Sequence, residues 1–222
     1  MSASVLKRAV AEGVGTALLL AAVVGSGIMA TRLSDGNVAL ALLANAIATG
    51  GALIAIIITF GPISGAHLNP VVTLALVERA GETGAIVLAY IAAQILGAFA
   101  GVFLAHAMFG LPIVEWSSHV RATPGEWLGE FVATFGLVAL VLSGVRHAPA
   151  AMPYAVAAYI TAAYWFTSST SFANPAVALA RALTDTFAGI RPQDVPAFVA
   201  AEFAGAGTAA LLFRWLLKDE TH

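Results

Sequence analysis

Two glutamates, Glu12 and Glu130, lie inside long apolar stretches, where an ionisable side chain is costly and is functional by default. One possible function is a relay of protons or ions. The other is structural, because a carboxylate can accept hydrogen bonds from backbone N–H groups that no helix satisfies. The two glutamates occupy matching places in an internal repeat, so we expect each to brace one non-helical segment.

His67 and several serines are the other residues whose side chains could do chemistry. A metal site would need further His, Asp or Glu ligands near His67, and the sequence has none at workable spacing. It also lacks a Gly-x-Ser-x-Gly motif and an intramembrane Asp–His pair that could activate a serine. Cysteine is absent, which excludes disulfides and thiolate chemistry. The sequence therefore predicts no enzyme activity, no cofactor and no metal site.

The composition is that of an integral membrane protein. Of the 222 residues, 60% are hydrophobic and only 10% are charged, whereas a soluble protein has about 25% charged residues. The mean hydropathy is +0.91. A net charge of -2 gives no support for nucleic-acid binding. We therefore expect the lipid bilayer to surround the chain, and we expect no nucleic-acid partner.

Six apolar stretches reach the roughly 18–20 residues that a helix needs to cross a bilayer. The first begins like a signal peptide, but its length and the presence of Glu12 predict a retained span. The connecting segments are short, which leaves no room for a soluble domain. The six stretches lie near residues 6–30, 38–60, 84–108, 127–146, 149–168 and 195–218.

Two further stretches, residues 64–71 and 171–177, each contain an Asn-Pro pair followed by a short apolar run. Asn is a favoured N-cap and Pro suits the first helical position, so each pair predicts a helix start. The helices would begin at Pro70 and Pro175 and run for roughly eight or nine residues, about half of a hydrocarbon core. Half-helices of this kind direct positive dipole ends into a membrane, an arrangement that handles solutes.

The order span, span, half-helix, span occurs twice along the chain. Ala-Glu-Gly-Val-Gly-Thr at residues 11–16 resembles Gly-Glu-Phe-Val-Ala-Thr at residues 129–134. Because each repeat has three spans, the second must enter the bilayer from the opposite side, and such repeats place their site at the midplane. The sequence predicts an all-α membrane protein with one transmembrane channel domain over residues 1–222. Repeat one covers about 1–110 and repeat two about 125–222.

The basic residues give a weak preference for one orientation. With the N-terminus inside, six of the ten lie at cytoplasmic ends and four at outer ends, which favours both termini in the cytoplasm. The cytoplasmic group is Lys7, Arg8, Arg79, Arg146, Arg214 and Lys218, and the outer group is Arg32, Arg121, Arg181 and Arg191.

Two Asn-Pro-Ala-like half-helices, after the second and fifth spans of this repeat, resemble the aquaporin (major intrinsic protein) family. The segment Ser-Gly-Ala-His-Leu-Asn-Pro before the first one is highly specific, and the resemblance covers essentially the whole chain. It implies an aquaporin-like bundle of six transmembrane helices plus two re-entrant half-helices, with one pore per subunit in a homotetramer. Asn69 and Asn174 would meet at mid-membrane and donate N–H groups to the passing molecule. The half-helix motifs are Pro70-Val71 and Pro175-Ala176, and the implied ladder of pore carbonyls comes from Gly65, Ala66, His67, Ser171, Phe172 and Ala173.

Two residues depart from the family pattern. Val71 replaces the alanine of the first motif, and Val177 stands where the family has an arginine that narrows the outer pore. Counted from the motifs, the other constriction positions are Thr49, Ser171 and Ala162 or a neighbour of Ala162. These residues predict a wide selectivity filter without a fixed charge.

Arg181 lies one helical turn beyond Val177 and on the same helix face. It either supplies part of the missing charge at the outer mouth, or it extends to the membrane interface as arginines near helix ends commonly do. The sequence leaves these two interpretations open.

The second Asn-Pro segment and the residues after it resemble a bacterial branch of the family that is often found beside arsenic-resistance genes. The resemblance implies a channel in a bacterial inner membrane for neutral metalloid hydroxides such as arsenite. A wide filter that carries hydroxyl groups is equally compatible with water and with glycerol-like polyols. Passive conduction is therefore the expected function.

Two other functions are alternatives. A secondary transporter also uses inverted repeats and broken helices, but no charged residue lies near Asn69 or Asn174 in sequence to bind or couple an ion. A largely closed, structural member of the family is the second alternative. The intact polar residues Asn69, Asn174 and Thr49 argue against it.

Overall fold

The computed structural model describes residues 4–80 and 83–218, and the regular secondary structure in these ranges is helical. Five helices within these ranges are long and apolar enough to cross a membrane. The sixth expected span is a 3-10 turn, η1 (Pro149–Ala151), followed by α6 (Met152–Phe166), which alone is shorter than a full crossing. The five long helices are α1 (Val5–Leu33), α2 (Val38–Ser64), α4 (Gly84–Phe109), α5 (Pro124–His147) and α8 (Val195–Leu216).

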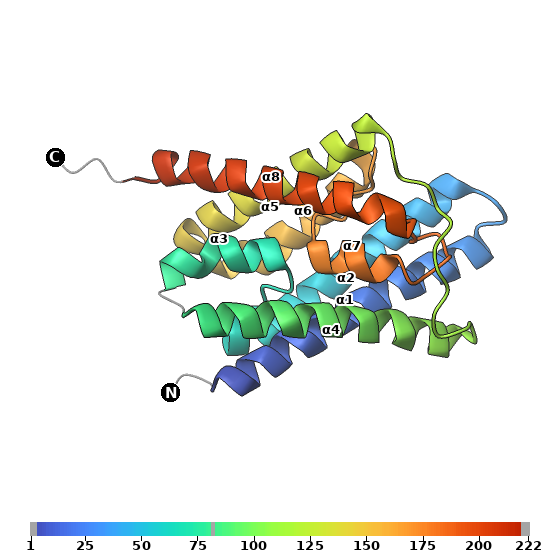
Figure 1. Cartoon of the computed structure of the whole chain (residues 1–222), viewed down its shortest axis with the longest axis horizontal. Coiled ribbons are helices and arrows are strands. Elements are labelled where there is room, and N and C mark those ends of the chain that lie inside the picture. The colour runs from blue at the N-terminus through green and yellow to red at the C-terminus, as the bar shows by residue number, and fades with distance from the viewer. Residues whose placement is uncertain (1–3, 81–82, 219–222) are drawn as a thin grey trace.

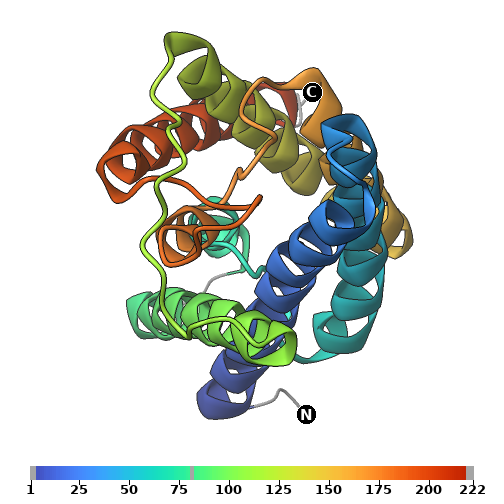
Figure 2. The same cartoon turned by 90° about the vertical axis from the view of Figure 1, so that its right-hand side faces the viewer.

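Two short helices, α3 (Pro70–Ala80) and α7 (Pro175–Arg181), begin at the two Asn-Pro pairs. They lie end to end between the long helices (Figure 1), and the view along the bundle shows α7 in front of α3 near its centre (Figure 2). α7 ends before the expected end near Leu183, because the N–H of Leu183 bonds to the carbonyl of Ala180 and tightens the last turn. Each half of the chain thus has the expected half-helix.

Each half of the chain also packs its first long helix closely against its last one. A Cβ on Gly97 of α4 would lie 2.1 Å from the Gly13 carbonyl oxygen of α1, so this contact requires glycine. Gly205 of α8 occupies the corresponding place, where a Cβ would lie 2.4 Å from the carbonyl oxygen of Phe131 in α5. Close backbone contacts of this kind hold helices together where lipid supplies no hydrophobic driving force.

The surface and the two ends of the bundle differ in character. α1 begins and α8 ends at the same end of the bundle (Figure 1). At the opposite end, residues 111–123, which we call the crossing loop, run in front of α7 from α4 to α5 (Figure 2). Large apolar side chains are exposed along the long helices, as a lipid-facing surface requires. Leu18, Leu88, Leu104, Leu128 and Leu211 are examples.

Candidate functional site

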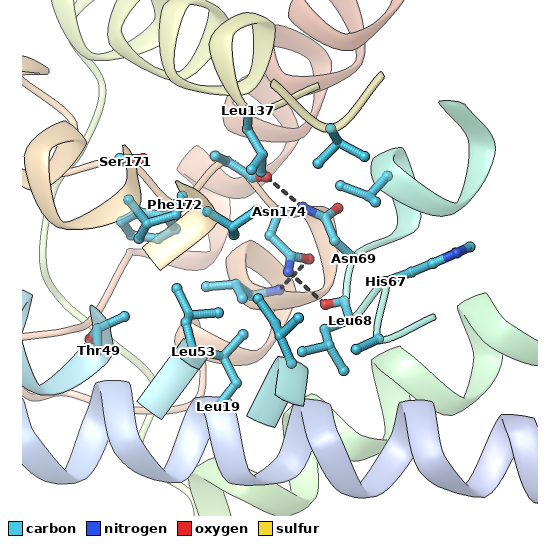
Figure 3. A pocket seen from close by; sticks show the side chains of 18 of the residues that line it. Leu19, Thr49, Leu53, His67, Leu68, Asn69, Leu137, Ser171, Phe172 and Asn174 are labelled. Atoms are coloured by element: carbon cyan, nitrogen blue, oxygen red, sulfur yellow. Dashed lines mark hydrogen bonds between the residues drawn. The ribbon is translucent and has the colours of Figure 1, made fainter. Parts of the chain in front are cut away.

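The two half-helices meet through the side chains of Asn69 and Asn174, which point toward each other in Figure 3. Asn69 Nδ2 donates to the carbonyl of Ala173 at 2.7 Å. Asn174 Nδ2 donates to the carbonyl of Leu68 at 2.8 Å. Each asparagine therefore bonds to the residue before the other one, and the junction is reciprocal.

The same two side chains cap the half-helices that they precede. Asn69 Oδ1 accepts from the N–H of Val71, and Asn174 Oδ1 accepts from the N–H of Ala176, both at 3.0 Å. These bonds satisfy backbone donors that have no partner within the helix. An amide nitrogen carries two N–H donors, and the junction uses one of each pair. The second remains for a molecule beside the junction.

The segments that lead into the two half-helices share an unusual backbone. In each, the residues four, three and one positions before the asparagine have positive φ. The left-handed region is unfavourable for residues with a Cβ, so the surroundings must hold these segments in place. The residues are Gly65, Ala66 and Leu68 in the first segment and Thr170, Ser171 and Ala173 in the second.

Glu12 holds the first segment. Its Oε1 accepts from the N–H of His67 at 2.9 Å and from the Ser64 hydroxyl at 2.6 Å. Its Oε2 accepts from the N–H of Leu68 at 2.6 Å and from Gln94 Nε2 of α4 at 2.8 Å. The carboxyl group is fully buried. Three of its four hydrogen bonds hold the segment, and the fourth connects it to α4.

Glu130 holds the second segment in the same way. Its Oε1 accepts from the N–H of Phe172 at 2.8 Å and its Oε2 accepts from the N–H of Ala173 at 2.7 Å. Glu202 of α8, which sequence reasoning missed, accepts from the N–H of Asn174 at 3.0 Å. Two carboxyl groups thus bind three consecutive backbone donors. The signal for Glu202 was the repeat, because Ala-Ala-Glu in α8 occupies the place of Ala-Ala-Gln in α4.

A cavity of about 130 Å³ lies beside the asparagine junction, and residues on both sides of the junction line it. Its walls near the junction are apolar, with Leu19 and Leu53 on one side and Leu137 on the other in the view of Figure 3. Towards the end with the chain termini it is lined by Leu76, Val145, Met152 and Val156. Towards the opposite end it is lined by Thr49, Tyr164, Ser171, Val177 and Arg181.

Residues 1–152, more than half of the chain, match the sequence profile of the family described as "Major intrinsic protein". Over 212 residues the chain is 56% identical to aquaglyceroporin AqpS of Rhizobium meliloti (strain 1021). The alignment covers 96% of this chain and 91% of that protein. This chain belongs to the major intrinsic protein family. Members of this family are channels, so the expectation of a multi-pass membrane channel that is not an enzyme is confirmed.

The fold agrees with the family. The X-ray structure of the aquaglyceroporin from Plasmodium falciparum superposes with a TM-score of 0.76 and covers 96% of this chain and 97% of that one. The two sequences are 19% identical, so this likeness concerns the fold alone. The predicted aquaporin-like helical architecture is confirmed.

Three of the four filter positions expected for a major intrinsic protein line the cavity, namely Thr49, Ser171 and Val177. The fourth expectation was wrong, because the side chain of Ala162 is exposed and lies outside the lining. Tyr164 lies there instead, and its hydroxyl is 3.2 Å from Thr49 Oγ1. Successive helical residues are about 100° apart, so a shift of two residues moves a side chain to the other face of α6.

Arg181 also lines the cavity of this major intrinsic protein. Only 3% of its surface is exposed, and its guanidinium lies 3.4 Å from the centre of the Phe172 ring. Its Nε donates to the carbonyl of Ala188. The side chain is thus held inside the bundle and does not extend to the membrane interface. The four expected filter positions contain no arginine, and Arg181 adds a charged residue elsewhere in the cavity lining.

The remaining motif residues have two locations. Val71 lies outside the lining and packs with Val138 of α5 and Ala206 of α8, so its two extra methyl groups point away from the cavity. Pro70, Pro175 and Ala176 form the starts of the half-helices and also lie outside the lining. The six residues of the expected carbonyl ladder all line it: Gly65, Ala66, His67, Ser171, Phe172 and Ala173.

His67 lines the cavity on the side of the junction that leads to the chain termini, and its ring extends away from the junction (Figure 3). Its Nδ1 is 3.2 Å from Thr73 Oγ1, and its ring packs edge-on against Tyr90 at 5.3 Å between centres. Within residues 4–80 and 83–218, no group of three or more His, Asp or Glu side chains is arranged to hold a metal ion.

Arg121 of the crossing loop is a second buried arginine near the filter, and sequence reasoning placed it only among the outer basic residues. It donates to the carbonyls of Ser169 at 3.1 Å and Gly189 at 2.9 Å, and its guanidinium lies 5.0 Å from the centre of the Phe172 ring. Burial lowers the pKa of Arg121. Its partners are 48 and 68 residues away in sequence, so no local pattern could have identified them.

The crossing loop is tied down at its surface as well. The backbone N–H of Ser118 donates to Asp185 Oδ1 at 2.8 Å, and the Ser118 hydroxyl donates to the same oxygen at 3.0 Å. These hydrogen bonds lower the pKa of Asp185 below its ordinary value of 3.8. Asp185 follows α7, so the bonds fix the loop to the chain that carries the filter.

Proposed function

We propose that this chain is a passive channel for water and small neutral solutes, and that they pass through the cavity beside Asn69 and Asn174. The junction carries the proposal, because each asparagine has one amide N–H that the protein leaves free for a passing molecule. The walls around it are apolar and leave no room for a hydration shell, so a solute must exchange its water for these donors. The carbonyls of the two left-handed segments form the matching ladder of acceptors.

The solutes that fit are glycerol-like polyols and metalloid hydroxides such as arsenite. The outer part of the cavity offers the hydroxyl groups of Thr49, Tyr164 and Ser171. Ser171 Oγ is buried and has no hydrogen-bond partner among the described residues, so it can bond to a solute hydroxyl. The relative AqpS is named an aquaglyceroporin, which supports polyols as a solute class.

The filter in this proposal is wide because Val177 replaces the family's arginine. Arg181 supplies a positive charge one helical turn further along the cavity. Its place in the lining and its burial support this role, since a guanidinium beside a narrow path repels cations and hydronium. Discrimination against cations and restriction of solute size are then functions of two different positions.

We also propose the assembly and the location. The chain forms one channel domain, with repeats over about 1–110 and 125–222, and it assembles as a homotetramer in a bacterial inner membrane. Both termini face the cytoplasm. The position of both chain ends at one end of the bundle and the excess of basic residues at that end support this orientation.

The test uses purified protein in liposomes, with shrinkage or swelling followed by light scattering. Gradients of glycerol, urea and arsenite are compared with sucrose and with empty liposomes. We expect glycerol and arsenite to cross faster than in empty liposomes, in proportion to their gradients and without dependence on a proton or sodium gradient. Flux that saturates and needs an ion gradient would favour a secondary transporter, and a membrane as tight as the empty one would favour a closed structural protein.

A further inference from the structure

Glu130 and Glu202 place two carboxyl groups side by side in the interior of the bundle. Both are fully buried, and they accept from the consecutive backbone N–H groups of Ala173 and Asn174. In the hydrogen bonds to Phe172, Ala173 and Asn174, the carboxyl oxygens of the pair are the acceptors. Glu202 Oε2 has no donor among the described residues. An acceptor thus faces an acceptor, and the pair lacks one hydrogen.

In repeat one, the residue that corresponds to Glu202 is Gln94, and its amide supplies the hydrogen that the carboxyl pair lacks. There the neighbour of the bracing carboxylate is an amide, and Gln94 Nε2 donates to Glu12 Oε2 at 2.8 Å and to Thr73 Oγ1 at 2.9 Å. Glu202 stands at the corresponding position of repeat two but has no N–H to donate. A proton on the carboxyl pair would restore the missing bond.

The surroundings favour that proton over a second charge. The charged groups that face the pair are Arg181 of α7 and, on the side of Glu130, Arg121 of the crossing loop. Neither carboxyl has an ion-pair partner among the described residues, and the Nε of Arg181 donates to the Ala188 carbonyl instead. Two adjacent negative charges in a buried, weakly polar site repel strongly, so one of them is neutralised by a proton.

We propose that Glu130 and Glu202 share one proton at neutral pH, and that this hydrogen holds the second re-entrant segment as the Gln94 amide holds the first. Glu202 is a positioning residue, because it acts on the cavity through the backbone of Asn174. In alkaline solution hydroxide removes the proton as water and leaves two carboxylates in contact. Their repulsion loosens the segment and lowers conduction. This last step rests on the proposed channel function.

Infrared spectroscopy of the protein in liposomes tests the shared proton without any flux measurement. A buried protonated carboxyl group gives a carboxylic-acid C=O stretch that shifts in D2O and disappears on alkaline titration. We expect this band in the wild type at neutral pH and its loss in both Glu202→Gln and Glu130→Gln. Gln94→Glu, which builds the same pair in repeat one, should add a second band.

Glu115→Gln in the crossing loop is the control and should leave the spectrum unchanged. Size-exclusion chromatography verifies that each variant is folded. A band that persists in both Glu202→Gln and Glu130→Gln, or a wild type with no band at neutral pH, would overturn the shared proton.

Glycerol flux at neutral and alkaline pH tests the positioning role. We expect the wild type to lose flux several-fold over the pH range in which the infrared band disappears, and Glu202→Gln to have a flat profile. A wild-type profile that stays flat while the band titrates would overturn the role of the proton in positioning. Absence of flux in every variant at every pH would instead refute the proposed channel, and the infrared result would stand by itself.

Discussion

Arg181 stacks on the ring of Phe172, with its guanidinium carbon 3.4 Å from the ring centre. Phe172 precedes α7 and Arg181 ends it, so the stack connects the two ends of the half-helix beside the cavity. A guanidinium on an aromatic face is held by the ring's charge distribution as well as by packing. The stack therefore fixes a positive charge near the filter, at a residue that is not one of the four expected filter positions.

Replacing Arg181 with alanine removes this charge. We expect proton and potassium flux into liposomes to rise about tenfold, since one unit charge contributes on the order of 1–2 kcal/mol to such a barrier. Glycerol flux should change less. Arg32→Ala is the control, because it removes an exposed arginine from the same end of the bundle. Unchanged flux for every solute in Arg181→Ala would remove the charge role.

Val177→Arg should narrow the filter. We expect the long side chain to slow glycerol and arsenite more than water, since the larger solutes need the space that valine leaves. Stopped-flow light scattering with each solute measures the ratio. Val177→Met adds length without charge and separates size from electrostatics. Equal slowing of water and glycerol would contradict the wide filter.

Tyr164→Phe removes the hydroxyl that bonds to Thr49 while the ring remains. We expect glycerol flux to fall about two- to tenfold relative to water, the value of one hydrogen bond of about 0.5–1.5 kcal/mol. The comparison variant is Ala162→Val, whose side chain is exposed on the other face of α6 and should not alter the ratio. If Ala162→Val changed selectivity and Tyr164→Phe did not, the filter residue would be misassigned.

Glu12→Ala should destabilise the protein strongly. It leaves four donors without an acceptor in the interior, and each costs about 1–3 kcal/mol, so we expect the free energy of unfolding to fall by at least about 4 kcal/mol. Thermal unfolding in detergent, followed by circular dichroism, measures the change. Glu115→Ala in the crossing loop serves for comparison. A variant as stable as wild type would show that water satisfies these donors.

The contact between Ser118 and Asp185 should weaken in acid. The folded-state pKa of Asp185 is lowered, so its contribution is fully present above the ordinary value of 3.8 and is lost as the pH falls through the lower folded-state value. Hydrogen exchange at the Ser118 amide should therefore accelerate in this range after correction for intrinsic exchange. Asp185→Asn should show little of this acceleration.

The sequence predicts the features that depend on neighbouring residues. Asn69 and Asn174 precede prolines, and capping alone places two helix starts there. The apolar stretches predict the crossings because length and composition suffice for that purpose. Glu12 and Glu130 could be related to the re-entrant segments because the repeat puts one beside each of them.

Features that depend on helix rotation or on distant contacts were beyond this reasoning. Counting back from Asn174 leads to Ala162, but this count does not determine which face of α6 meets the cavity, and Tyr164 is the residue that lines it. Glu202 was detectable by aligning α8 with α4, but neither stretch has a motif that draws attention to it. Arg121 acts across the fold from a loop without regular structure, and only its tertiary contacts identify it.

The reciprocal asparagine bonds also constrain the order of biogenesis. The bonded residues are 104 and 106 positions apart in sequence, so the first half-helix cannot form these bonds until the ribosome has synthesised the second. Until then the segment with positive φ before the first half-helix lacks its contacts with the second repeat. Each half of the polypeptide supplies the hydrogen-bond acceptor that the asparagine of the other half needs. Halves expressed separately should therefore be unstable, and co-expression should restore a stable protein.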